Sequence, residues 1–134
     1  DFGYWAVVTF APNFVLDALG MPAEAQAQLS TVEHERTTTV LQMMLPMARR
    51  AMGNNTDIVE QNLPEIGSLS IQSITVPTLV IHAVDDTLVP FAQGQYSAEQ
   101  IPGAQLVSVD QGGHFVIVKD AVWEEIRRFI DQNG

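Results

Sequence analysis

Two short polar segments, Asp85-Asp86 and Gly112-Gly113-His114, contain the residue types that acid–base chemistry requires. Each follows a short apolar run that is typical of a β-strand. A carboxylate beside an imidazole fixes the tautomer of the ring and stabilises its protonated form, which makes the histidine an effective general base. The two glycines permit a tight turn that aims His114 away from its strand. These residues therefore predict a pair between His114 and one of the two aspartates.

Each segment also has an ordinary structural explanation when it is considered alone. An aspartate before a helix is a good N-cap, and a single histidine in a loop is usually a surface residue. The two segments, however, follow consecutive strands, and the carboxyl ends of parallel strands lie at one edge of the sheet. Ligands and catalytic groups collect at that edge, so the position favours a functional pair.

The second half of the chain alternates between strand and helix patterns. Strands are predicted at 78–83 and 105–109, and helices at 90–100 and from Asp120, which is expected to cap the last helix. The β-rich apolar run at 78–83 indicates a strand that is buried on both faces. Parallel strands joined by right-handed crossovers satisfy this order, so the predicted fold class is α/β.

The first half has a helical pattern instead. An apolar helix is expected over residues 2–19, broken near Pro12, and Ser30 with Glu33 forms a capping box for a second helix. The second helix carries apolar residues at spacings of three and four, which form one stripe: Val40, Met43, Met44, Met47 and Ala51.

Composition narrows the function further. The 134 residues hold 16 acidic and 6 basic side chains, a net charge of −10, which argues against nucleic-acid binding and against an anionic membrane surface. No run of 18 apolar residues is present, so a membrane span is not expected. The chain has no cysteine and no pattern of a signal peptide or a metal cluster, and we expect a cytoplasmic protein without metal.

The stretch PTLVIHAVDDTLVPFAQGQYSAEQIPGAQLVSVDQGGHF resembles the C-terminal part of the α/β-hydrolase family. The resemblance covers about residues 74–134 and rests on two motifs: a small strand-terminal residue followed by an acid, and glycine-histidine-aromatic. In the family the acid lies three positions after the small residue, here Ala83, which selects Asp86 and leaves Asp85 as a loop or cap residue. Asp86 and His114, 28 positions apart, are then the candidate catalytic residues.

The helical first half is similar, more loosely, to the cap that many α/β-hydrolases insert before their last core strands. On this resemblance residues 1–72 form a helical cap and residues 73–134 the C-terminal part of the core. Such caps cover the substrate, so the candidate substrate-binding residues are Met43, Met44, Met47 and Trp5. Plain packing between helices is the competing explanation for the methionine stripe.

A nucleophile elbow, Gly-x-Ser-x-Gly, is missing from the sequence. None of the six serines lies in such a motif: Ser30, Ser68, Ser70, Ser73, Ser97 and Ser108. In the family the nucleophile precedes the acid and the histidine, so we expect the serine upstream of Asp1, in a longer gene product. The chain then corresponds to the C-terminal half of the enzyme and is expected to be inactive when isolated.

The resemblance thus implies an esterase-like hydrolase of a small ester, thioester or related apolar acyl substrate, without a cofactor. An upstream serine would attack, His114 would act as general base, and Asp86 would orient His114. The alternatives are a non-catalytic binding or regulatory module of the same fold, and a small α/β domain that self-associates. Because strand 78–83 would have an open edge, we expect the missing N-terminal half or a second copy of the chain to cover it.

Overall fold

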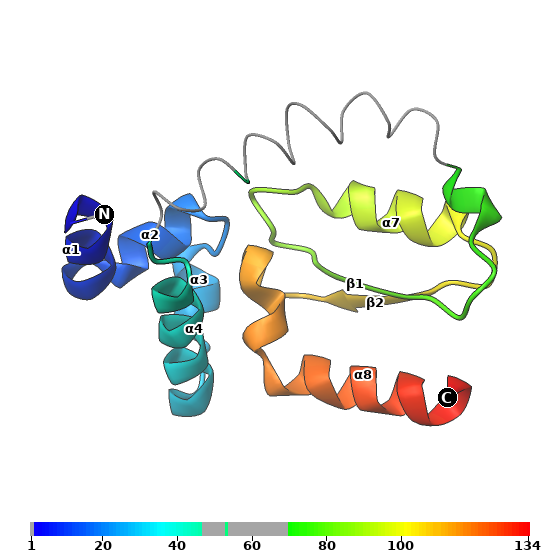
Figure 1. The fold of residues 1–134 in the computed structure, drawn as a ribbon. Helices are drawn as coiled ribbons and strands as arrows, with labels where there is room; N and C mark the ends of the chain where they lie inside the picture. Colours follow the sequence, from blue (N-terminus) through cyan, green and yellow to red (C-terminus); the bar gives the residue numbers. More distant parts are fainter. Residues whose placement is uncertain (1, 47–52, 54–69) are drawn as a thin grey trace.

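The computed structural model describes residues 2–46, 53 and 70–134, and combines a helical layer with a small α/β unit (Figure 1). The helical layer is made of four helices: α1 (Phe2–Phe10), α2 (Pro12–Ala18), α3 (Ala23–Gln26) and α4 (Thr31–Met43). After a 3-10 turn, η2 (Ile71–Ser73), the α/β unit contains β1 (Leu79–Ala83), α7 (Phe91–Gln100), β2 (Gln105–Val109), η3 (Gly113–Val118) and α8 (Asp120–Asn133).

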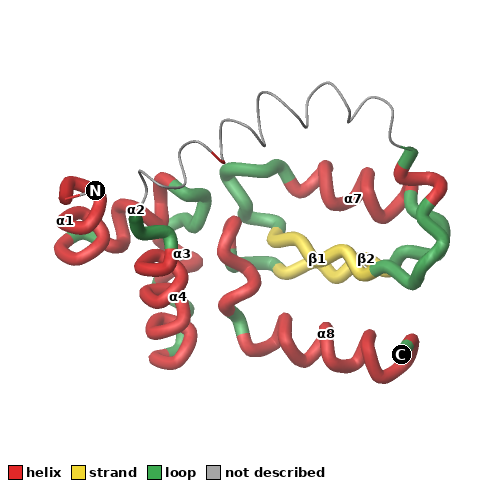
Figure 2. Tube along the Cα trace, viewed as in Figure 1, coloured by secondary structure: helices red, strands yellow, loops and turns green. Residues whose placement is uncertain are grey.

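Strands β1 and β2 are parallel and pair in full register, with Leu79 opposite Gln105 and Ala83 opposite Val109. Helix α7 connects the two strands and lies on one side of the sheet, while α8 lies on the other side (Figure 2). Both predicted strands are therefore present, and the mixed, parallel architecture agrees with the predicted α/β class. The two strands end at the same edge, so the segments that follow them, with Asp86 and His114, start side by side.

The expectation that strand 78–83 is buried on both faces is wrong for the described residues. Only Ala83 of β1 is buried, the other residues of this strand are half-buried, and β2 is more exposed still. The reason is that the sheet has two strands within the described part of the chain. Within this part of the chain, each strand thus has one edge without a strand partner, and α7 and α8 cover the two faces of the sheet.

The helical layer follows the pattern predicted from its sequence. The break falls at Ala11, and Pro12 occupies the start of α2, where its missing N–H is not needed. The capping box of α4 is present, with the Ser30 hydroxyl accepting from the Glu33 N–H and the Glu33 carboxylate accepting from the Ser30 N–H. Helix α4 ends at Met43. Val40 and Met43 of the predicted stripe are therefore helical and Met44 is the C-cap, whereas Met47 and Ala51 lie outside the described residues.

The hydrophobic core crosses from the helical layer into the α/β unit. Residues of all four helices and of the turns between them pack with Phe115 and Val118 of η3. These residues of the helical layer are Val8, Val15, Leu16, Met21, Ala25, Leu29 and Leu41. Half-buried Tyr4, Leu19, Val40 and Met44 pack against this cluster. The two layers are thus joined by apolar packing at η3, directly after His114.

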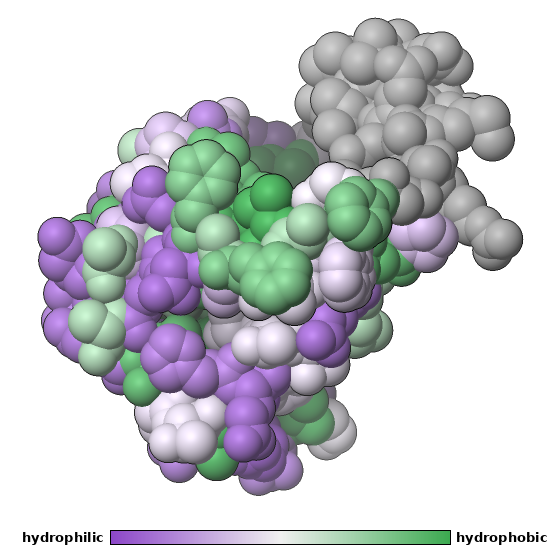
Figure 3. All heavy atoms as spheres, turned by 90° about the vertical axis from the view of Figure 1, so that its left-hand side faces the viewer, coloured by the Kyte–Doolittle hydropathy of each residue, from purple (hydrophilic) through white to green (hydrophobic). Residues whose placement is uncertain are grey.

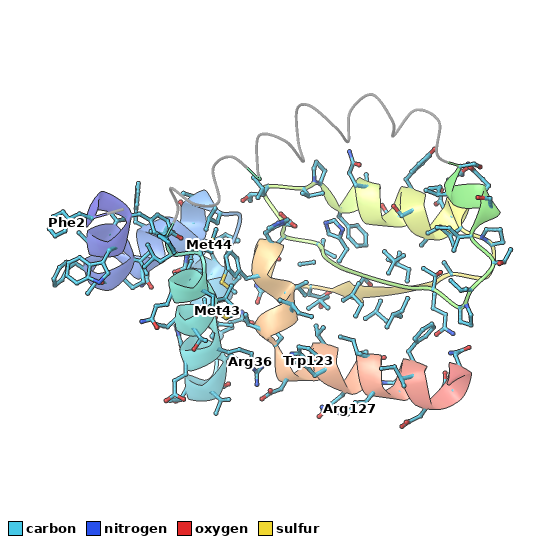
Figure 4. All side chains as sticks on the ribbon, viewed as in Figure 1. Phe2, Arg36, Met43, Met44, Trp123 and Arg127 are labelled. Atoms are coloured by element: carbon cyan, nitrogen blue, oxygen red, sulfur yellow. The ribbon has the colours of Figure 1, made fainter. Side chains whose placement is uncertain are left out.

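Polar contacts reinforce the same junction. The Glu33 carboxylate accepts from the Asp120 N–H at 2.9 Å, and the Arg36 guanidinium binds the Val118 carbonyl and, at 2.9 Å, the Asp120 carboxylate. Figure 4 shows Arg36 between α4 and the start of α8. The prediction that Asp120 caps the last helix is wrong, because Lys119 is the N-cap and Asp120 is the first residue of the helix.

The face of the helical layer that points away from the α/β unit carries an apolar patch with polar residues around it (Figure 3). Three phenylalanines of α1 and α2 are largely exposed: Phe2, Phe10 and Phe14. A surface of this kind is typical of a contact region. None of the helices in the described part of the chain is long and apolar enough to cross a membrane.

Candidate active site

The turn after β1 holds the Asp86 carboxylate almost completely buried, with 4% of its side chain exposed. One oxygen, Oδ1, accepts hydrogen bonds from the backbone N–H groups of Leu88 and Val89, at 2.8 and 2.9 Å. Both bonds are local, so the sequence of the turn itself fixes the carboxylate. The second oxygen, Oδ2, is thereby directed toward the segment that follows β2.

His114 meets this second oxygen: its Nδ1 lies 3.0 Å from Asp86 Oδ2. A carboxylate accepts only, so Nδ1 carries the proton, and Nε2 of the neutral ring keeps a free lone pair. The side chain is 44% exposed, in contrast to the buried carboxylate. The arrangement is a buried acceptor that orients a solvent-accessible base.

Electrostatics keep the aspartate ionised. Burial raises the pKa of the Asp86 carboxyl group, but hydrogen bonds from Val89, the His114 ring and Leu88, together with the charge of His114, outweigh burial. The pKa therefore lies below its ordinary value. Asp86 is a carboxylate at neutral pH and can stabilise a positive charge on His114.

Asp85 has a role that the sequence did not reveal. Its Oδ1 accepts from the backbone N–H groups of Gly112 and Gly113, at 2.9 and 2.8 Å. The adjacent aspartate thus joins the same two loops as Asp86, but through the backbone rather than the ring. A signal was present in the sequence: two glycines before a histidine expose consecutive N–H groups that need an acceptor.

A second histidine borders the site. His82 Nε2 lies 3.0 Å from the Val89 carbonyl oxygen and 3.6 Å from Asp86 Oδ2. Since a carbonyl accepts only, Nε2 carries the proton. The ring packs edge-on against Phe91, and α7 approaches it at Gly94, where a Cβ would lie 2.7 Å from His82 Nδ1. His82 thus joins the end of β1 to the turn that follows it.

The helical layer contacts the site through one turn. The His114 N–H donates to the Gly20 carbonyl at 2.8 Å. Gly113 has a φ of +55°, and a Cβ there would lie 2.2 Å from the same carbonyl oxygen. Gly20 has a φ of +84°, and a Cβ there would lie 2.7 Å from the Leu88 Cβ. The backbone of the turn at Gly20 therefore contacts both loops of the site, the one with Leu88 and the one with His114.

A cavity of about 160 Å³ opens beside the pair. Its lining combines the polar site with apolar side chains of β1 and η3: Ile81, His82, Ala83, Asp86, Val89, His114 and Val116. It lies at β1, which, like β2, has one edge without a strand partner in the described part of the chain. The cavity is thus where a reacting group would approach His114.

The predicted substrate-binding residues are not in this lining. Trp5 packs with the rings of Phe2 and Phe10 on α1, and the sulfur of Met44 accepts a hydrogen bond from the Tyr4 hydroxyl. Met43 is exposed at the end of α4, and Met47 lies outside the described residues. Figure 4 shows Met43 and Met44 together at that end of α4.

The described part of the chain contains no group of three histidine, aspartate or glutamate side chains placed to bind a metal ion. The site is instead an aspartate–histidine pair at the carboxyl ends of two parallel strands, which is the arrangement of an α/β-hydrolase-like protein.

Comparison with known proteins agrees with this class. The sequence model of the family described as "Serine hydrolase" matches residues 13–132, and the chain therefore belongs to this family. Within the curated proteins, segments of about 50 residues are similar to proteins named "Putative carbamate hydrolase RutD".

Three of these relatives illustrate the extent of the similarity. The identity is 45% over 51 residues with the protein of Pseudomonas savastanoi pv. phaseolicola, 46% over 48 with that of Stutzerimonas stutzeri, and 47% over 49 with that of Klebsiella pneumoniae subsp. pneumoniae. These matches cover 38%, 36% and 37% of this chain, but only 20%, 18% and 18% of the relatives. The matched segment thus spans about a fifth of each relative. No solved structure matches the chain.

Proposed function

We propose that this chain supplies the general base, His114, and its orienting carboxylate, Asp86, to a serine hydrolase. The observation that carries the proposal is the 3.0 Å contact between His114 Nδ1 and Asp86 Oδ2, two side chains that belong to separate loops. The nucleophilic serine belongs, in this proposal, to an upstream part of the same polypeptide. The 134-residue chain alone is then inactive, because His114 has no serine hydroxyl to deprotonate.

The reaction follows from the protonation states at the site. Asp86 holds the proton on Nδ1 of His114, so Nε2 accepts the proton of the serine hydroxyl as its oxygen attacks the acyl carbon. The C–O bond that forms gives a tetrahedral intermediate. His114 then returns the proton to the leaving group as the bond between the acyl carbon and the leaving group breaks, which leaves the acyl-enzyme. Water, deprotonated by the same Nε2, hydrolyses the acyl-enzyme and regenerates the serine.

The substrate class we propose is a small apolar acyl compound: an ester, a thioester or a carbamate. Ile81, Val89 and Val116 give the cavity its apolar walls. The carbamate is included because the similar proteins carry that word in their names. In this proposal residues 1–72 act as a cap over the substrate, and Trp5, Met43, Met44 and Met47 contact it.

The proposal also names what covers the open edge of β1. The upstream half of the polypeptide would pair with β1 and complete the cavity from the side where the described residues leave it open. If that half is absent, a second copy of the chain is the partner that covers this edge.

A serine-reactive probe tests the proposal on the complete gene product. The wild type is expected to react with an activated phosphonate, and His114→Ala and Asp86→Asn to lose labelling and the hydrolysis of a p-nitrophenyl ester series. For Asp86→Asn the expected loss in kcat is roughly 10⁴-fold, as in other triads. The matched control is Asp110→Asn, because Asp110 is exposed and lies in the segment 110–114 that leads from β2 to His114 (the histidine loop). Unchanged turnover in Asp86→Asn would contradict the assignment.

A further inference from the structure

Two consecutive backbone N–H groups, those of Gly112 and Gly113, converge on one oxygen of Asp85. Both glycines are buried, so water does not replace this acceptor freely. Hydrogen bonds to a charged acceptor are roughly twice as strong as those between neutral groups. The pair of bonds therefore holds the backbone immediately before His114 much more firmly than an ordinary surface turn.

The ordinary explanations for Asp85 do not account for these contacts. Pro90 is the N-cap of α7, so Asp85 does not cap that helix. Its bonds also do not close a local turn, because they reach 27 and 28 residues along the chain. Asp85 thus connects the segment 84–89 that follows β1 (the acid loop) with the histidine loop.

The two neighbouring carboxylates divide the positioning of the histidine between them. Asp86 contacts the imidazole ring, whereas Asp85 holds the peptide groups that carry it. On the opposite side, the His114 N–H is held by the Gly20 carbonyl. Because residues 85 and 86 are adjacent, a displacement of the histidine loop stretches the contacts of both carboxylates together.

We propose that Asp85 is a positioning residue for the reaction: its carboxylate holds the Gly112-Gly113 backbone so that His114 stays within hydrogen-bond distance of Asp86. The inference rests on the proposed function, since it assigns Asp85 a part in the work of His114. Misplacement of a reacting group by about 1 Å can cost roughly 10²-fold in rate. We therefore expect Asp85→Ala to lower kcat by about that factor and to leave KM nearly unchanged.

The first test uses NMR on the 134-residue chain. In Asp85→Ala, the Gly112 and Gly113 amides should exchange with solvent faster than in the wild type. The pKa of the Asp86 carboxyl group should rise, because the contact with His114 weakens while the bonds from Leu88 and Val89 remain. Asp85→Asn, which keeps an acceptor oxygen without the charge, should show smaller changes in the same direction, and Asp110→Ala should change neither.

The outcomes are distinguishable. Unchanged amide exchange and an unchanged Asp86 titration in Asp85→Ala would overturn the inference, even if Asp86→Asn abolishes activity. If Asp85→Ala does not fold, Asp85→Asn decides: its neutral oxygen binds more weakly, so the two glycine amides must exchange faster while Val107 in β2 does not. The proposed function fails separately, if Asp86→Asn of the complete gene product stays active, and the catalytic role of Asp85 then fails with it.

Discussion

Replacement of Gly113 by alanine is the most direct test of how the histidine loop is built. Gly113 has a φ of +55°, a conformation that costs an L-residue roughly 1–2 kcal/mol. The new Cβ would also lie 2.2 Å from the Gly20 carbonyl oxygen and 2.6 Å from Met21 Cα. Both are backbone atoms, so no side-chain rotation relieves the contact, and the loop must move away from the helical layer.

The size of the effect follows from the bonds that this movement breaks. The hydrogen bond from His114 to Gly20 contributes about 1 kcal/mol, and a charge-assisted bond to Asp85 about 1.5–3 kcal/mol. Added to the conformational cost, these losses amount to roughly 3.5–6 kcal/mol in the free energy of unfolding.

Gly103→Ala is the matched control. Gly103 also has a positive φ, +76°, but a Cβ there would have no atom within 4 Å. It should therefore show the conformational cost alone, roughly 1–2 kcal/mol. Urea unfolding followed by circular dichroism measures both variants. Equal destabilisation of the two would refute the reasoning, because the contact with Gly20 would then contribute nothing.

Three further predictions concern other contacts. His82→Leu should lower stability by about 1 kcal/mol through loss of the bond to the Val89 carbonyl, and His82→Gln should recover part of this in the same urea assay. Hydrogen bonds hold the pKa values of Glu33 and Asp86 below their ordinary values despite burial. The free energy of unfolding that these two carboxylates contribute is therefore complete above the ordinary carboxyl range, near pH 4, and is lost as the pH falls below it. Glu33→Gln should make the free energy of unfolding, measured with urea at several pH values, decrease less at acid pH. Light scattering should find the purified chain associated with a second copy through β1, and a stable monomer would contradict this.

Much of the fold is visible in local sequence patterns. The break at Pro12 and the capping box of Ser30 and Glu33 depend on contacts within a few residues, and both strands were indicated by short apolar runs; each agrees with the structure. A contact between His114 and one of the two aspartates was also predictable, because parallel strands that end at one edge bring their following loops together, and the family resemblance selected Asp86.

The remaining features depend on contacts that no local pattern encodes. The Asp120 N–H binds Glu33, 87 positions away, so the start of α8 is set by another helix rather than by its own cap. The exposure of β1 depends on the number of strands beside it, and the residues of β1 do not indicate that number. Asp85 lies in a loop, as predicted, but the Gly112-Gly113 sequence indicates only that two N–H groups need an acceptor and does not indicate which residue supplies it.

The turn at Gly20 has a consequence for protein engineering. Its carbonyl accepts from His114, and α4 is tied to the start of α8 through Glu33 and Arg36. A chimera that exchanges the helical segment for that of a relative would therefore replace part of the support of the histidine loop. Grafts that retain Gly20, Glu33 and Arg36 should preserve the geometry of His114, whereas those that replace them will need a redesigned histidine loop as well.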